Sequence, residues 1–244
     1  MKDVAVVAYC RTGIARATRG ALNQTHGIPM TAHVLRHAVK RAGIDPAEVE
    51  DVVVGCGISL VQFNLNMNGF FYAPLQQRMP AVWWTMNQTA DFVAKKYGIS
   101  REAQDAYVVQ SQARVAAAAA AGKFAEEIVP FTTTMKITDK VTKASHEQEV
   151  TLDRDEGPRP DTTLAGLAAL KPVYPGGTTT AGNASQLSDG AGAVVMMDAD
   201  LAARRELPIL GLFRGMQLAA VAPEEMSIAV TPAIRKLMQQ HSSA

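Results

Sequence analysis

The sequence has only two cysteines in 244 residues, Cys10 and Cys56. Two cysteines are too few for a disulfide framework, and their spacing does not match Cys-x-x-Cys. Both lie in apolar, strand-like surroundings, which suits reduced thiols. We therefore expect a cytoplasmic protein.

A surplus of charge of either sign is also lacking. The 24 Lys and Arg residues nearly balance the 23 Asp and Glu residues, which leaves a net charge of +1. This balance gives no electrostatic reason to expect nucleic acid or an anionic membrane as a partner. No apolar run reaches the roughly 18 residues that a membrane-spanning helix needs, and the first residues lead directly into a strand pattern rather than an apolar leader. We expect neither a membrane segment nor a signal peptide.

The N-terminal quarter shows clear helix and strand patterns. Residues 4–8 are a continuous apolar run, typical of a strand that is covered on both faces in a parallel sheet. Residues 29–42 repeat apolar side chains at helical spacing and stop at Gly43. Residues 52–54 form a second apolar run. We predict a β-α-β unit with two parallel strands, because crossover connections are right-handed.

The remainder of the chain is richer in helix. Residues 62–84 contain many Asn, Gln, Met and aromatic residues together with two prolines, and we expect a loop there. Helices are predicted at residues 86–97, at 100–121 and from 231 onward. Residues 131–150 indicate an exposed hairpin or ordered loop, and apolar runs predict strands at 193–197 and from 209. The fold class is therefore α/β, and its central insertion is mostly helical.

Four stretches, in order along the chain, carry a resemblance to a known family. They are Tyr-Cys-Arg-Thr-Gly-Ile at 9–14, Thr-Ala-Asp to Ser-Gln at 89–112, Arg-Pro-Asp-Thr-Thr-Leu to Lys-Pro-Val-Tyr at 159–174, and Thr-Ala-Gly-Asn-Ala-Ser-Gln-Leu-Ser-Asp-Gly-Ala at 180–191. Together they cover nearly the whole sequence, which resembles the thiolases, a family of acyl-CoA acyltransferases. The resemblance implies an incomplete thiolase-like fold. Residues 1–61 would form part of the N-terminal core and residues 62–178 the loop domain that binds coenzyme A, while residues 179–244 would return to the core.

The fourth stretch implies a ligand site. Its small residues and the hydrogen-bonding groups of Asn183 and Ser185 suit close approach of a ligand, although an ordinary polar turn has the same composition. The resemblance places Ala181, Ser185 and Leu187 along the pantetheine arm of coenzyme A. Gln186 stands where the family usually has glycine, which would narrow the slot.

Three positions outside this stretch also acquire roles from the resemblance. Arg159 would approach the coenzyme A nucleotide, where a planar guanidinium suits phosphate. Met86 would line the acyl pocket, and Tyr174 would lie beside the adenine or the pantetheine. An exposed loop arginine and an ordinary core methionine explain the first two equally well.

The residues that perform thiolase chemistry have no counterpart here. The family uses a cysteine nucleophile in an Asn-x-x-Cys-x-Ser-Gly stretch, which this sequence does not contain. Its histidine and second cysteine belong to later Gly-His-Pro and Cys-x-Gly-Gly-Gly motifs, which are also absent. Residues 51–56 match the second strand of the family, whereas residues 57–62 match the end of the fourth. A deletion or an omitted segment at this junction would remove the nucleophile, and we expect no catalytic residue.

Other candidates for catalysis or metal binding are weaker. Cys56 lies between two glycines at a predicted strand end, but nothing nearby lowers a thiol pKa, and a free cysteine is usually a small buried hydrophobe. Cys10 is no better placed. His33 and His37 have the i, i+4 spacing of a metal pair, yet no Cys, Asp or Glu lies beside them, so we expect a solvated helix face and no metal.

Two functions fit these observations. In the first, the complete form is an acyltransferase of fatty acid metabolism, which cleaves 3-ketoacyl-CoA or condenses acetyl-CoA through a cysteine thioester. In the second, the chain is a non-catalytic remnant that binds coenzyme A or another protein. A lipid-transfer role has no supporting feature. Acyl-CoA or acetyl-CoA would be a substrate rather than a resident cofactor, and the resemblance also implies association into a homo-oligomer.

Overall fold

The computed structural model describes residues 3–57 and 72–241, which form two compact units. Unit 1 consists of Met1–Leu60, Val115–Arg159 and Gln186–Arg214. Unit 2 consists of Val61–Arg114, Pro160–Ser185 and Gly215–Ala244. The junction predicted at residues 57–62 lies almost entirely outside the described residues.

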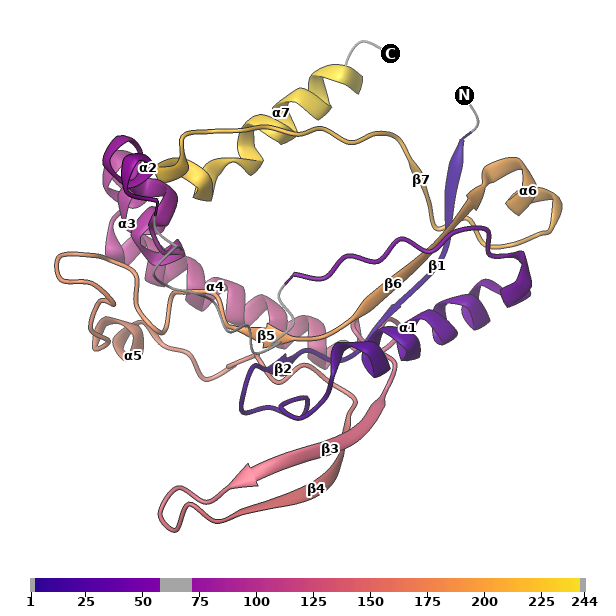
Figure 1. Cartoon of the computed structure of the whole chain (residues 1–244), viewed down its shortest axis with the longest axis horizontal. Coiled ribbons are helices and arrows are strands. Elements are labelled where there is room, and N and C mark those ends of the chain that lie inside the picture. The colour runs from indigo at the N-terminus through magenta and orange to yellow at the C-terminus, as the bar shows by residue number, and fades with distance from the viewer. Residues whose placement is uncertain (1–2, 58–71, 242–244) are drawn as a thin grey trace. The chain divides into compact units, whose positions relative to one another are not determined.

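Unit 1 is built on a three-stranded sheet in the order β6-β1-β7 (Figure 1). The central strand β1 (Val4–Arg11) pairs antiparallel with both β6 (Gly192–Asp198) and β7 (Gly211–Phe213). Helix α1 (Gly27–Ala42) packs on β1 and β6 through its buried residues Val34, Ala38 and Ala42. Its last turn ends at Gly43, which adopts φ +69° as a left-handed cap.

The predicted parallel β-α-β unit is wrong. Residues 51–56 form no strand, and Val52, Val53 and Val54 are 53%, 91% and 60% exposed. An apolar run of β-branched residues becomes a strand only where another strand offers hydrogen bonds. The neighbours of β1 in this sheet are β6 and β7, both antiparallel to it.

The remaining elements of unit 1 are small. Strands β2 (Ala15–Arg16) and β5 (Ser188–Asp189) pair with each other, η1 (Pro46–Glu48) begins with a capping box from Asp45, and α6 is Ala199–Arg204. Strands β3 (Phe131–Thr138) and β4 (Ser145–Leu152) pair in register along their full length, which confirms the hairpin alternative for this segment.

Unit 2 is mainly helical. Helix α3 (Met86–Lys96) begins with a capping box between Thr85 and Gln88, and α4 (Arg101–Ala120) runs from unit 2 into unit 1. Both helices confirm the predictions at 86–97 and 100–121. The other elements are α2 (Ala73–Arg78), η3 (Pro80–Trp83), α5 (Leu164–Ala168), η4 (Pro223–Ile228) and α7 (Val230–His241).

The loop predicted at residues 62–84 is wrong for the part that the structure describes, since α2 and η3 occupy most of residues 73–83. Pro74 and Pro80 lie in the first turns of these elements, where a proline replaces no helical hydrogen bond. A proline at this position begins a helix rather than breaking one.

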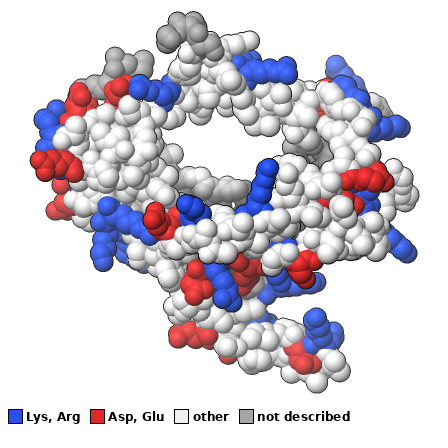
Figure 2. Space-filling view, turned by 180° about the vertical axis from the view of Figure 1, so that it is seen from behind, with Lys and Arg blue, Asp and Glu red and all other residues white. Residues whose placement is uncertain are grey.

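Two features bear on contact with a membrane or another charged partner, namely the distribution of charged side chains and the length of the apolar helices. Lys and Arg side chains alternate with Asp and Glu side chains on the face shown in Figure 2. Among the described residues, no helix is both long enough and apolar enough to cross a bilayer.

His33 and His37 do not lie on a fully solvated face of helix α1. Both side chains are half-buried, their ring centroids lie 4.3 Å apart, and the His33 ring meets Phe131 edge-on at 5.0 Å. The Nε2 atom of His33 is buried without a hydrogen-bond partner among the described residues. Burial, and next the neighbouring His37, lower the pKa of His33.

This environment predicts a loss of stability in mild acid. Because the folded-state pKa of His33 lies below its value in the unfolded chain, protonation favours unfolding as the pH falls below about 6.5. The free energy of unfolding in urea should therefore be lower at pH 5.5 than at pH 7.5. The variant His33→Gln should lose part of this difference in stability, whereas the control variant His146→Gln, at an exposed position, should keep it. Equal pH dependence in His33→Gln and the unsubstituted chain would contradict the assignment.

Candidate functional site

Residues 180–184 form a compact turn that is held by its own side chains. The backbone N–H of Thr180 donates to Asn183 Oδ1 at 2.7 Å. The N–H groups of Gly182 and Asn183 donate to Thr180 Oγ1 at 3.2 and 3.3 Å, and that of Ala184 donates to the Thr180 carbonyl at 3.0 Å. Threonine and asparagine stabilise turns in this way because their short side chains reach the local backbone.

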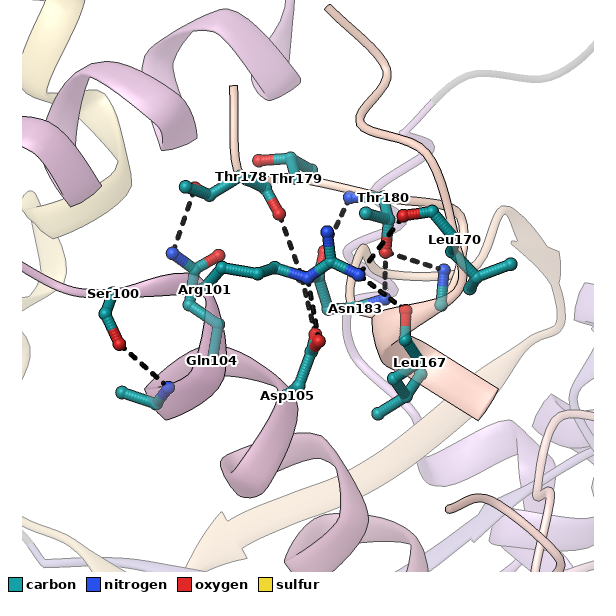
Figure 3. Close-up of polar contacts among 12 residues, drawn as sticks. Ser100, Arg101, Gln104, Asp105, Leu167, Leu170, Thr178, Thr179, Thr180 and Asn183 are labelled. Carbon is teal, nitrogen blue, oxygen red and sulfur yellow. Dashed lines mark hydrogen bonds and ion pairs between the residues drawn. The ribbon is translucent and has the colours of Figure 1, made fainter. Parts of the chain in front are cut away.

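Helix α4 anchors this turn through a buried carboxylate (Figure 3). Asn183 Nδ2 donates to Asp105 Oδ1 and to the Thr178 carbonyl, both at 3.0 Å. Asp105 is only 3% exposed, and Arg101 Nε donates to its other oxygen at 2.7 Å. The Arg101 guanidinium also donates to the carbonyls of Leu167 and Leu170 at the end of α5. A charge this buried is tolerated because every partner is a charged or polar group.

Sequence reasoning missed Arg101 and Asp105 as parts of this site. The only local signal was their i, i+4 spacing on a helix, which is common at exposed positions. Their role depends on Asn183, which lies 78 residues further along the chain from Asp105.

The structure distributes the predicted ligand residues between the two units. Ala181 lies within the turn and Ser185 directly follows it; both belong to unit 2 and are exposed, and Met86 is the first residue of α3 in the same unit. Met86 is 60% exposed and is therefore no ordinary core methionine. Arg159 and Leu187 belong to unit 1, and both are exposed. Their contacts with coenzyme A remain predictions.

A pocket of about 520 Å³ lies in unit 2 between α3 and residues 174–178. Aromatic and apolar side chains form much of its wall, namely Trp84, Phe92, Ile99 and Tyr174. The Tyr174 hydroxyl lies 3.0 Å from Thr85 Oγ1. The predicted role of Tyr174 beside a ligand stays a prediction.

The two cysteines differ in their surroundings. Cys10 in β1 is 3% exposed, and its thiol donates to the Val34 carbonyl at 3.2 Å. Burial raises the pKa of Cys10, which disfavours the nucleophilic thiolate. Cys56 is exposed, so the expectation that it is a buried hydrophobe is wrong, because no strand forms at residues 51–56. Within residues 3–57 and 72–241, no group of three or more His, Cys, Asp or Glu side chains is placed to hold a metal ion.

Comparison with solved structures shows the same fold. Acetyl-CoA acetyltransferases from Bacillus anthracis and Syntrophomonas wolfei superpose with TM-scores of 0.77 and 0.80 at 24% and 22% identity. The superpositions cover 98% and 99% of this chain and 76% of each of those chains. The predicted fold class, an incomplete α/β thiolase-like fold, is therefore confirmed.

Proteins with similar sequences point to the same family as the solved structures. The chain is 34% identical to the peroxisomal 3-ketoacyl-CoA thiolase 5 of Arabidopsis thaliana, over 95% of its own length and 64% of that protein. It is 31% identical to the 3-ketoacyl-CoA thiolase of Bacillus subtilis, over 98% of its own length and 77% of that protein. The chain thus spans less than two thirds of the Arabidopsis relative.

The relatives also have internal residues that this chain lacks. The alignment with the Arabidopsis protein extends over 297 residues, more than the 244 residues of the chain. The sequence model of the family "Thiolase, N-terminal domain" matches residues 76–200 and leaves the first 75 residues unmatched. On its fold, its relatives and this match over half its length, the chain belongs to the thiolase family.

Proposed function

We propose that this chain binds an acyl-CoA thioester along residues 181–185 but forms no acyl-enzyme of its own. In this account, acyl transfer through a cysteine thioester belongs to thiolases with a complete N-terminal half. The chain retains recognition of the coenzyme A arm and lacks the nucleophile.

The observation that carries the proposal is the hydrogen-bonded turn of residues 180–184. It fixes the backbone on both sides of Ala181, whose side chain is small and exposed. Pantetheine is a thin chain with two amides, which suits a rigid backbone edge with exposed polar groups such as the Ser185 hydroxyl. The proposal also rests on the expectation, drawn from the resemblance to thiolases, that Ala181, Ser185 and Leu187 lie along that arm.

The absence of a suitable nucleophile supports the second half of the proposal. Thioester exchange needs a cysteine thiol and a base that removes its proton to form the nucleophilic thiolate. The Cys10 thiol is buried against α1, and this burial raises its pKa. The alignment leaves internal residues of the relatives without a counterpart, and the family's Asn-x-x-Cys-x-Ser-Gly stretch is missing from the sequence.

Acyl transfer by the chain itself is the second candidate. One observation favours it: the Cys56 side chain is exposed between Gly55 and Gly57, where an acyl-CoA has access. Among the described residues, however, no histidine forms a hydrogen bond with Cys56 that would activate it. Thiolysis of 3-ketoacyl-CoA and condensation of acetyl-CoA would both require that activation.

Titration calorimetry with coenzyme A tests the binding proposal. The variant Ala181→Phe should raise the dissociation constant about tenfold or more, because the ring occupies the space for the pantetheine arm. The matched variant Ala106→Phe, at an exposed position on α4 of the same unit, should bind as the unsubstituted chain does. Equal affinity of both variants, or no heat of binding for the unsubstituted chain, would refute the proposal.

Cellular location and self-association remain proposals of the same kind. We propose a cytoplasmic, homo-oligomeric protein, while the names of several plant relatives place those proteins in the peroxisome. Imaging of a tagged chain beside a peroxisomal marker, and light scattering of the purified chain, decide these two points.

A further inference from the structure

We propose that Asp91 is a positioning residue for coenzyme A binding, which it supports by holding Thr178 and Thr179 directly before the turn of residues 180–184. This inference rests on the proposed function. It adds a residue that acts through the backbone of the binding segment.

A single oxygen of Asp91 carries the anchor. Asp91 Oδ1 accepts the backbone N–H groups of Thr178 and Thr179 at 2.9 and 2.8 Å. The hydroxyl groups of the same two threonines donate to it at 3.3 and 2.8 Å. A carboxylate that accepts several hydrogen bonds holds its donors more firmly than a neutral acceptor does.

The neighbouring sequence is adapted to this contact. A Cβ atom at Gly177 would collide with Asp91 Oδ2, so glycine permits the close approach of the two chain segments. Burial raises the pKa of Asp91, but the hydrogen bonds from Thr178 and Thr179 outweigh this and lower it overall. The carboxylate is therefore ionised at neutral pH, which is the state that the four donors require.

The anchor lies immediately before the binding turn. The Thr178 carbonyl accepts a hydrogen bond from Asn183 Nδ2, and the Thr179 carbonyl accepts one from the backbone N–H of Val173 at 2.8 Å. Asp91 on α3 and Asp105 on α4 thus fix the two ends of residues 178–183. Loss of the first anchor should free the backbone that leads into Ala181.

Helix α3 does not depend on Asp91 for its own packing. Its buried residues are Thr89, Val93 and Ala94. At its C-terminal end, Lys96 forms an ion pair with Glu225 at 2.7 Å. Substitution of Asp91 should consequently loosen residues 178–183 while α3 and η4 stay in place.

The test combines calorimetry with hydrogen exchange on the full chain. In Asp91→Ala, the dissociation constant for coenzyme A should rise about tenfold, and the amides of residues 178–184 should lose protection while those of residues 86–96 keep it. Asp91→Asn, which retains one acceptor oxygen but not the negative charge, should recover only part of the affinity. The exposed control Asp161→Ala should change neither quantity.

Three results would overturn the inference. One is unchanged protection of residues 178–184 in Asp91→Ala, and another is loss of protection throughout unit 2, which would show a purely structural role. The third is unchanged affinity with lost protection, since the segment would then not matter for binding. Absence of binding by the unsubstituted chain would instead refute the proposed function, and hydrogen exchange would still decide whether Asp91 orders the segment.

Discussion

Asp105→Ala is expected to lower the free energy of unfolding of unit 2 by about 3 kcal/mol and to abolish coenzyme A binding. The substitution removes the partner of Arg101 and the anchor of Asn183 in one step. Arg101 would then remain largely buried with only the Leu167 and Leu170 carbonyls to accept from its guanidinium. An unpaired buried charge costs more than the pair contributes, which is why the loss is large.

Urea unfolding followed by circular dichroism measures this effect. The control Asp161→Ala removes an exposed carboxylate from the same unit and should change the free energy by less than about 0.5 kcal/mol. Asp105→Asn keeps one acceptor and should fall between the two. A loss below about 1 kcal/mol in Asp105→Ala would show that water replaces the carboxylate and that the network is not a structural anchor.

Arg11→Ala is expected to destabilise unit 1 by about 2 kcal/mol. The Arg11 guanidinium donates to both oxygens of Asp155 at 2.7 and 3.0 Å and to Glu127 Oε1 at 2.8 Å. It therefore joins β1 to two segments that lie 116 and 144 residues further along the chain. The side chain is 22% exposed, so water compensates part of the loss, and we expect a smaller effect than at Asp105.

Two variants sharpen this second test. Arg11→Lys keeps the charge but not the planar fork, and it should recover less than half of the stability. Arg204→Ala, at an exposed position of α6 in the same unit, should have little effect. If Arg11→Lys were as stable as the unsubstituted chain, charge alone would explain the contact, and the bidentate geometry would be irrelevant.

The elements that sequence reasoning located correctly are those with local signals. Gly43, where the sequence predicted the end of a helix, adopts positive φ, and Gly98 and Gly122 do so shortly after the ends of α3 and α4. The helix of residues 86–96 begins with Thr85 and Gln88, which cap each other within four residues of sequence. These interactions depend only on neighbours in the chain.

The incorrect predictions concern features that depend on distant partners or on exact position. Residues 52–54 have the composition of a strand, but in the part of the chain that the structure describes no strand pairs with them. Pro74 and Pro80 suggested a loop because their place in the first helical turn was not evident. Within the site, the turn of residues 180–184 was predictable from its own residues. Its anchors Asp91 and Asp105 were not, because they lie 87 and 78 residues from Thr178 and Asn183.

The central claim is that the chain binds acyl-CoA without accepting the acyl group. Intact mass spectrometry after incubation with acetyl-CoA tests it most directly, because transfer to a thiolate would leave acetyl on the protein and release coenzyme A. The account predicts an unmodified mass under conditions in which calorimetry detects coenzyme A binding. An acetylated chain whose adduct disappears in Cys56→Ser would contradict it and would make Cys56 a nucleophile.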